Sequence, residues 1–441
     1  MNKNKTYSFD GTEFTLGFCD RPEKYNQLFQ TIDKASNCIP RGAGLSYCTA
    51  SSGDGITSID MTKFNRIIEF NDQRGIIKVE AGIKIGDLIQ FIIHKGWNLT
   101  VIPGYPSITV GGCVAFNVHG KSQFNIGTFG DHVKELTFYH PKYGEMKCSN
   151  NKNKSFFDLT LGGFGLTGVI LDVTLVLSRL PGNTIIRKKV KCYNLSDAVG
   201  KMDSLKTEND YVYSWNNLGK TGDHFGEGII YCEKFSNGNT NGFKDFNYLR
   251  ISSDSRRKFV INLINGITAE LINYFYYHKE FISGSTSDLS IRECTFPIYG
   301  KEIYYFLFGK QGLREYQVIV PYNFANDFFA RLYSLVKKYH MPIALGSLKM
   351  FRGENKYLNF CQDGICIAID VPANANSGKF FSEIDNLTIN LNGIANLSKD
   401  SRLPARSVAD MYREYGKFKN DIYEFDPEKV FTSSLRQRLD V

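Results

Sequence analysis

Three glycine-rich segments within the first 170 residues constrain this 441-residue chain more than any other feature. They are residues 41–47 (RGAGLSY), 103–121 (PGYPSITVGGCVAFNVHGK) and 161–170 (LGGFGLTGVI). Glycine allows positive φ and leaves room for a ligand close to the backbone. Successive N–H groups in such a turn can bind an anion. One such turn is ordinary in a β-rich domain, whereas three separated segments indicate a large polar ligand.

The third segment contains the pattern GxGxxG at Gly163, Gly165 and Gly168. In the Rossmann dinucleotide site, a helix follows these glycines directly, because its N-terminus receives the pyrophosphate. Here residues 169–177 (VILDVTLVL) are apolar and β-branched, which is typical of a strand. The segment therefore does not predict a Rossmann NAD site.

Strand and helix patterns follow one another without strict βαβ alternation, which predicts the α+β class. Beyond residue 183 glycine clusters become rare and Tyr and Phe more frequent. Predicted elements there are strands at 211–215, 228–232, 314–321 and 364–371 and helices at 323–339 and 379–391. We expect a first domain at 1–182, a second at 183–395, and a C-terminal segment at 396–441 that returns to the first.

Composition excludes several other classes of protein. The net charge of +8 permits weak attraction to anionic partners, but no dense Lys/Arg block or nucleic-acid-binding motif occurs, so no nucleic acid is expected. The ten cysteines include no CxxC pair, and no histidine stands near Cys361 and Cys366. We therefore predict no metal site and expect reduced thiols in a cytoplasmic protein.

Neither a signal peptide nor a transmembrane helix is predicted. The first ten residues are polar, and no run of 18 apolar residues occurs. Residues 259–277 (FVINLINGITAELINYFYY) predict an amphipathic helix. Two interpretations of this helix stay open: a core or cap helix, or an interfacial helix in peripheral contact with a membrane.

The order and spacing of the glycine segments resemble the vanillyl-alcohol oxidase / p-cresol methylhydroxylase superfamily of FAD-dependent oxidoreductases. Residues 119–136 (HGKSQFNIGTFGDHVKEL), 398–404 (SKDSRLP) and 425–439 (FDPEKVFTSSLRQRL) look most like the decaprenylphosphoryl-β-D-ribose 2′-oxidase subgroup. The resemblance implies a PCMH-type FAD-binding domain of two α+β subdomains, and a substrate (cap) domain with an antiparallel sheet. It also implies a role in cell-envelope biosynthesis.

The resemblance assigns roles to individual residues. The cofactor-binding positions that it implies are Arg41, Gly42, Ala43, Gly44, Leu45, Ser46, Tyr47, Gly104, Thr109, Gly111, Gly112, Asn117, His119, Gly120, Gly163, Gly165 and Val169. Lys399 and His119 are the implied catalytic residues. The implied substrate contacts are Lys121, Gln317, Lys349 and Lys399. Leu45 stands where some members attach FAD through a histidine, so the FAD is expected to be non-covalent.

Three departures from the subgroup lie near the expected substrate pocket. Ala368 stands where the subgroup has a cysteine two residues before Asp370, and the nearest cysteine is Cys366. Positions 366 and 368 share one face of a strand, so either could line the pocket. Residues 122–124 (SQF) replace NHH, and Asn396 replaces an aromatic residue. These changes bear on the identity of the substrate more than on the type of reaction.

The implied reaction is oxidation of a secondary sugar hydroxyl to a ketone by hydride transfer to FAD. The expected substrate is a polyprenyl-phosphate-linked pentose, and a separate short-chain reductase would complete an epimerisation. Two alternatives stay open: an aldonolactone or alditol oxidase that acts on a free sugar, and a flavin-binding protein without turnover.

Overall fold

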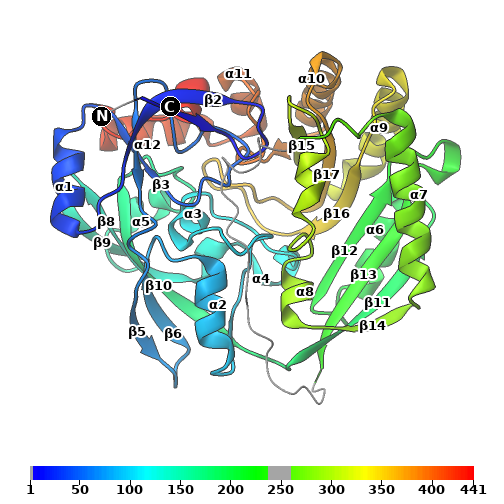
Figure 1. Ribbon diagram of the computed structural model, residues 1–441, viewed down its shortest axis with the longest axis horizontal. Helices are drawn as coiled ribbons and strands as arrows, with labels where there is room; N and C mark the ends of the chain where they lie inside the picture. The colour runs from blue at the N-terminus through cyan, green and yellow to red at the C-terminus, as the bar shows by residue number, and fades with distance from the viewer. Residues whose placement is uncertain (1–2, 237–259) are drawn as a thin grey trace.

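A computed structural model of the chain describes residues 3–236 and 260–441. These residues form a four-stranded, a six-stranded and an eight-stranded sheet. The first two sheets belong to the N-terminal 180 residues, and the third forms the opposite side of the molecule (Figure 1). Helices and strands are mixed along the chain without regular βαβ alternation, so the predicted α+β class is confirmed.

The four-stranded sheet positions the first glycine segment. Its strands, in spatial order, are β1 (Asn4–Tyr7), β2 (Phe14–Asp20), β4 (Thr57–Asp60) and β3 (Cys38–Arg41). β3 and β4 pair in parallel, and α1 (Tyr25–Lys34) packs Leu28 and Ile32 into the adjoining core. Because β3 ends at Arg41, the sheet determines where the loop with Gly42 and Gly44 begins.

The six-stranded sheet lies beside the second and third glycine segments. Its strands are β5 (Ile67–Asn71), β6 (Ile76–Glu80), β7 (Trp97–Leu99), β8 (Val133–His140), β9 (Gly144–Ser149) and β10 (Val169–Arg179). The helices between them are α2 (Ile85–Ile93), α3 (Val110–Ala115), α4 (Gln123–Ile126) and α5 (Lys154–Thr160). β10 follows Gly168 directly, so the prediction of a strand in place of a Rossmann helix is confirmed.

The eight-stranded sheet separates two layers of helices. Its strands, in spatial order, are β14 (Thr286–Leu289), β11 (Thr184–Cys192), β13 (Glu227–Ser236), β12 (Tyr211–Asn217), β16 (Leu345–Phe351), β17 (Gly364–Pro372), β15 (Leu313–Val320) and β18 (Ile394–Ala395). Successive strand residues point to opposite faces. Ile230 packs with the core under α6 (Leu195–Leu205), α9 (Ala325–Tyr339) and α10 (Ala375–Asn390). Tyr231 points to the other face, which α7 (Gly266–Ile282) covers.

Local capping explains where two helices differ from their predicted bounds. α10 begins four residues earlier than predicted, because the Asn374 side chain accepts a hydrogen bond from Ser377 N. The helix predicted at 259–277 begins at Gly266, because Asn265 accepts hydrogen bonds from Ile267 N and Thr268 N. Residue 259 lies outside the described residues. Within residues 3–236 and 260–441, no helix is long and apolar enough to cross a bilayer.

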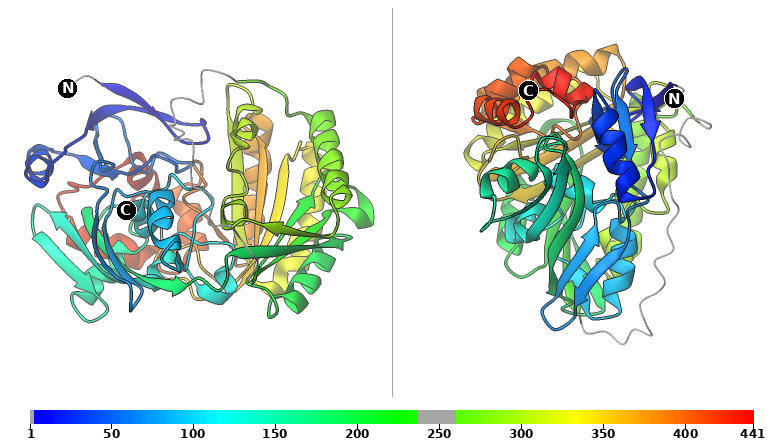
Figure 2. Two further views of the ribbon diagram at one scale, coloured as in Figure 1. Left: turned by 60° about the horizontal axis from the view of Figure 1, so that its bottom comes forward. Right: turned by 90° about the vertical axis from the view of Figure 1, so that its left-hand side faces the viewer.

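The C-terminal segment packs against the N-terminal sheets. It contains α11 (Ala405–Met411), α12 (Tyr415–Phe425) and α13 (Ser434–Leu439), which lie beside the N-terminal strands in Figure 2. Cys38 N donates to Val430 O, and Thr432 N donates to Cys38 O. This segment therefore extends the edge of β3, the strand that leads into the first glycine loop. The predicted domain boundaries at 182 and 395 themselves stay predictions.

One buried ion pair stabilises this C-terminal contact. Arg436 Nη1 lies 2.9 Å from Asp426 Oδ2, and both side chains are almost fully buried. Asp426 also accepts hydrogen bonds from the backbone N–H groups of Val430 and Phe431. Removing one partner of a buried pair leaves the other charge uncompensated in a low-dielectric environment.

We therefore expect Asp426→Asn to lower the free energy of unfolding by about 3–5 kcal/mol, as measured by urea denaturation. Asp440→Asn is the matched control, because Asp440 pairs with Lys419 at an exposed position. Equal urea midpoints for Asp426→Asn and Asp440→Asn would contradict the structural role of the buried pair.

Candidate active site

A cavity of about 730 Å³ lies between the glycine segments and the eight-stranded sheet. Its volume falls in the range of cofactor and ligand pockets. Residues from many parts of the chain line it, among them the loop at 41–47, the segment at 102–121, strands β15 to β17, and residues 396–399. The cavity thus gathers positions that are more than 350 residues apart in the sequence.

The first glycine loop wraps around a cation. Gly44 has φ +67°, and a Cβ added there would lie 2.2 Å from Arg41 Nη2. The guanidinium of Arg41 therefore lies against the loop, where its Nη1 donates to Ser51 Oγ at 2.9 Å. A Cβ added at Gly42 would lie 2.2 Å from Thr109 Oγ1. These two glycines allow the first and second segments to pack closely while keeping a positive charge at the cavity wall.

The cavity wall fits a dinucleotide such as FAD. Gly104 lines the cavity, and a Cβ added there would meet no atom within 4 Å. The folded chain therefore has room for a larger residue at this position, and a ligand that lies close to the backbone explains the glycine. With the Arg41 charge and the N–H groups of the 41–47 loop, the wall suits a pyrophosphate.

Lys399 lies where the C-terminal segment meets the first glycine loop. Tyr47 N donates to Ser398 O at 3.0 Å, and Lys399 Nζ lies 3.6 Å from the centroid of the Tyr47 ring. The same Nζ forms an ion pair with Glu315 Oε2 at 3.0 Å. Lys399 therefore reaches the cavity from the tail, while its counter-charge comes from β15.

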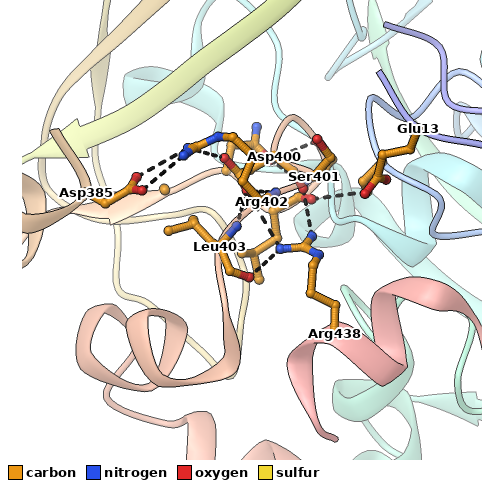
Figure 3. A network of polar contacts seen from close by, with 12 residues as sticks. Glu13, Asp385, Asp400, Ser401, Arg402, Leu403 and Arg438 are labelled. Carbon is orange, nitrogen blue, oxygen red and sulfur yellow. Dashed lines mark hydrogen bonds and ion pairs between the residues drawn. The ribbon is translucent and has the colours of Figure 1, made fainter. Parts of the chain in front are cut away.

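The residues that follow Lys399 hold it in place (Figure 3). Arg402 Nη2 lies 2.6 Å from Asp400 Oδ2, and Arg402 Nη1 lies 3.1 Å from Asp385 Oδ2 on α10. From α13, Arg438 Nη2 donates to the backbone oxygen of Asp400 at 2.7 Å. The Asp400 side chain is buried. In the KDSR motif, Lys399 thus faces the cavity, whereas Asp400 and Arg402 anchor the backbone beside it.

Two further groups inside the cavity have shifted pKa values. Burial lowers the pKa of Lys349, and the nearby Lys399 and Lys121 ammonium groups lower it further. Burial and the charges of Lys349 and Lys399 hold the pKa of His119 well below its ordinary value. The His119 ring packs against Phe351, with the ring centroids 4.8 Å apart. The imidazole is therefore neutral at physiological pH, so that one ring nitrogen can accept a proton.

Lys121 belongs to a buried polar cluster under α7. Its Nζ lies 3.4 Å from Glu233 Oε2 and 3.2 Å from Tyr213 Oη. Arg187 Nε donates to Glu233 Oε1 at 2.9 Å. Although burial opposes ionisation of Glu233, Lys121 and Arg187 keep its pKa below the ordinary value. The charge of Lys121 is therefore partly compensated within the protein.

The structure brings most of the predicted residues to one cavity. The predicted positions that line it are Arg41, Gly42, Ala43, Gly44, Leu45, Ser46, Tyr47, Gly104, Thr109, Gly111, Gly112, Asn117, His119, Gly120, Lys121, Gly165, Gln317, Lys349 and Lys399. Gly163 and Val169 do not line it. A Cβ on Gly163 would lie 2.2 Å from Leu159 O, and Val169 is buried in the core beside α1. Their neighbours Phe164, Gly165, Gly168 and Ile170 line the cavity instead.

Asn117 has a structural contact in addition to its place at the cavity wall. Its Oδ1 accepts a hydrogen bond from Gly130 N at 2.7 Å, and its backbone has φ +42°. Thr109 has a similar double role, because its Oγ1 accepts from Gly112 N at the start of α3. The polar atoms of both side chains therefore already support the second glycine segment.

The structure also decides between Cys366 and Ala368. Ala368 lines the cavity, whereas Cys366 is 1% exposed and does not. In the sheet, Cys366 pairs with Lys349 and Ala368 pairs with Ser347. Asn396, which replaces an aromatic residue, donates from Nδ2 to Gln317 Oε1 at 2.5 Å. Relative to the subgroup, Ala368 replaces a thiol and Asn396 replaces an aromatic ring. The cavity wall therefore has smaller side chains here and gains a polar amide.

Sequence reasoning missed Glu315, Asp370 and Tyr304, all of which line the cavity. Glu315 lies two residues before Gln317 on β15, so the two-residue period of the strand could have found it. Asp370 lies opposite Glu315 in the sheet and accepts a hydrogen bond from Tyr304 Oη at 2.7 Å. Burial, with the charge of Glu315, raises the pKa of Asp370 well above its ordinary value.

Comparisons with known proteins agree with this geometry. An FAD binding domain family model matches residues 20–148, a range that includes the first two glycine segments. Decaprenylphosphoryl-beta-D-ribose oxidase of Mycolicibacterium smegmatis is 26% identical over 416 residues, which cover 91% of this chain and 88% of that protein.

Other relatives match shorter stretches. D-lactate dehydrogenase of Anaerostipes hadrus is 29% identical over 36% of this chain and 35% of its own length. L-gulonolactone oxidase of Mus musculus is 30% identical over 30% of each chain. By name, these relatives are oxidases or dehydrogenases of different substrates.

The charges inside the cavity lead to a prediction for His119. Lys349→Met removes one of the positive charges that lower the pKa of His119, so we expect this pKa to rise. The measurement is an NMR titration of the histidine imidazoles, with the exposed substitution Lys24→Met as the control. An unchanged His119 pKa in Lys349→Met would contradict the electrostatic coupling of these two residues.

Proposed function

We propose that the chain is an FAD-linked oxidoreductase of the vanillyl-alcohol oxidase / p-cresol methylhydroxylase superfamily and that it oxidises a polyprenyl-phosphate-linked pentose. The proposed product is the keto-sugar formed from one secondary hydroxyl. When bound, FAD would supply the hydride acceptor for this oxidation. The remaining tasks fall to the protein: holding the sugar, managing the hydroxyl proton and binding the phosphate.

His119 and Lys399 suit the proton and the developing negative charge. Neutral His119 has a ring nitrogen that can accept the hydroxyl proton. Lys399 lies beside it in the same cavity as the cationic partner of Glu315. A fixed cation near the alkoxide oxygen lowers the energy of the charge that develops there. We therefore propose His119 as the proton acceptor and Lys399 as the electrostatic stabiliser.

The proposed substrate class rests mainly on the environment of Lys349. This lysine lines the cavity, and within residues 3–236 and 260–441 its Nζ has no hydrogen-bond or ion-pair partner. Lys121 and Lys399 each have a carboxylate partner. The charge of Glu315 offsets only part of the effect of burial on Lys349, and an anionic substrate group such as a phosphate would stabilise the ammonium further. This feature favours a phosphorylated substrate over a free sugar.

The proposal is tested by anaerobic reduction of the purified flavoprotein. Loss of the flavin absorbance is followed after addition of decaprenylphosphoryl-ribose, L-gulonolactone or D-lactate. We expect the phosphorylated sugar to reduce the flavin fastest. Reduction by L-gulonolactone or D-lactate alone would overturn the substrate assignment, and no reduction by any sugar would favour a flavin-binding protein without turnover.

Lys399→Ala is expected to keep FAD and to reduce the rate of flavin reduction by about 100-fold or more, because an electrostatic stabiliser of the transition state is lost. Stopped-flow absorbance with decaprenylphosphoryl-ribose measures this rate. Lys24→Ala, at an exposed position just before α1, is the control. A normal reduction rate in Lys399→Ala would remove this residue from the mechanism.

We further propose that the FAD is not covalently attached. Leu45 occupies the loop position where some relatives carry the linking histidine, and among the described residues that line the cavity His119 is the only His or Cys. Acid precipitation should therefore leave the yellow colour in the supernatant. Colour that stays with the precipitated chain would contradict this prediction, and mass spectrometry of His119 peptides would then identify the linkage.

Two finer parts of the proposal rest on the resemblance: a separate short-chain reductase that completes an epimerisation, and a place in cell-envelope biosynthesis. A cytoplasmic location is proposed from the cysteine usage. An aldonolactone or alditol oxidase stays the second candidate, because the relatives that match 30% of this chain include L-gulonolactone oxidase.

A further inference from the structure

α7 makes three polar side-chain contacts toward the protein, whereas a stripe of its apolar side chains faces outward. Asn273 is buried and donates from Nδ2 to Ile343 O at 2.9 Å. Tyr276 Oη lies 2.8 Å from Tyr231 Oη, and Glu280 Oε2 lies 3.3 Å from Lys189 Nζ. These contacts, spaced three and four residues apart, determine the rotation of the helix about its axis.

The outward stripe of α7 is strongly apolar. Ile267 is 74% exposed, Leu271 50%, Tyr274 51%, Phe275 64% and Ile282 85%. Their spacing places them along one side of the helix. The polar contacts on the inner side exclude a rotation that would bury this stripe. A helix of this kind requires an apolar environment on its outer side.

The exposed apolar surface extends beyond the helix. Ile261 and Leu263 are exposed, and their N–H groups donate to the backbone oxygens of Phe306 and Leu307. These bonds place them beside the short helix that carries exposed Ile303. Of the 19 exposed large hydrophobic side chains in the described residues, ten lie between residues 261 and 303. We call this surface the α7 patch.

The α7 patch is continuous with the mouth of the cavity. Ile272 of α7 and Ile303 are exposed, and both also line the cavity. A second copy of the chain seated on the patch would cover these two residues and block the entrance. A bilayer would instead provide an apolar path from the membrane to the cavity. Continuity with the substrate entrance therefore favours lipid as the occupant.

The charges on the same segments agree with a lipid surface. Lys279, Lys301 and Lys310 are exposed on the segments that form the patch. Of the acidic residues on these segments, Glu280 is paired with Lys189 and Glu302 is buried. Glu270 is exposed. Lysines around an apolar stripe are typical of helices that lie in the interface of an anionic bilayer.

We propose that the α7 patch docks the protein on the surface of an anionic lipid bilayer, with the cavity mouth facing the membrane. The inference concerns this surface and does not depend on the identity of the sugar. It predicts a reversible, peripheral association, because the helix lies in the interface and does not span it.

The test uses the FAD-loaded protein and vesicles of equimolar phosphatidylcholine and phosphatidylglycerol. We expect the wild type to sediment with these vesicles. The double variant Leu271→Ser/Phe275→Ser should bind them at least about tenfold more weakly, since it loses two large apolar contacts. The control Ile68→Ser/Val176→Ser replaces two exposed apolar residues on the six-stranded sheet and should bind like the wild type. FAD content and thermal unfolding report on the integrity of each variant.

A second readout does not depend on the serine variants. Both native tryptophans, Trp97 and Trp215, are buried. In Phe275→Trp, the new indole should emit at shorter wavelength when vesicles are added, and brominated lipids should quench it. An unshifted emission, or wild-type protein that stays in solution with the vesicles, would overturn the proposal.

Two other results would assign the patch to a different occupant. A wild-type dimer in the absence of vesicles that becomes monomeric in Leu271→Ser/Phe275→Ser would identify a self-interface and overturn lipid docking. Equal vesicle binding by Leu271→Ser/Phe275→Ser and the wild type would place lipid contact elsewhere. Because vesicle binding is measured without turnover, its failure is distinguishable from failure of the proposed oxidation.

Discussion

The contact between residues 396–402 and the first glycine loop is the constraint on which the site depends. The backbone bond from Tyr47 to Ser398 brings Lys399 over the Tyr47 ring. The ion pair of Arg402 with Asp385 on α10 and the hydrogen bond from Arg438 to the Asp400 backbone hold this segment in place. Without this contact, Lys399 would not lie against the first glycine loop, and the cavity would lose one wall. The chain therefore completes its active site only when its last 45 residues have packed.

This arrangement distributes charge unevenly within the cavity. Lys121 and Lys399 are each held by a carboxylate from the eight-stranded sheet, whereas Lys349 faces the cavity without such a partner. Burial, together with the charges of Lys349 and Lys399, keeps His119 neutral. One set of cations can thus serve two tasks: attraction of an anionic substrate and preparation of a neutral proton acceptor. The α7 patch lies at the entrance to this environment.

Much of the fold followed from local pattern, and the exceptions have identifiable causes. The strand after Gly168 was predictable because β-branched apolar residues disfavour a helix there. Glu315 was missed because its partner Lys399 is 84 residues away in the sequence. Gly163 and Val169 belong to the third glycine segment but lie outside the cavity, since neighbouring residues of a turn and strand point in different directions. The residue roles carried over from the resemblance stay predictions.

The sequence by itself determined the α+β class, the three glycine segments that predict a large polar ligand, and the presence of an amphipathic helix near residue 270. These features depend on local backbone preference and periodicity, which a single segment contains. Only the tertiary structure decided that Ala368 lines the cavity in place of Cys366, that Glu315 pairs with Lys399, and that the apolar side of α7 faces outward. Each of these depends on contacts between side chains that are far apart in the sequence. Those contacts form only when the sheets and the C-terminal segment pack together.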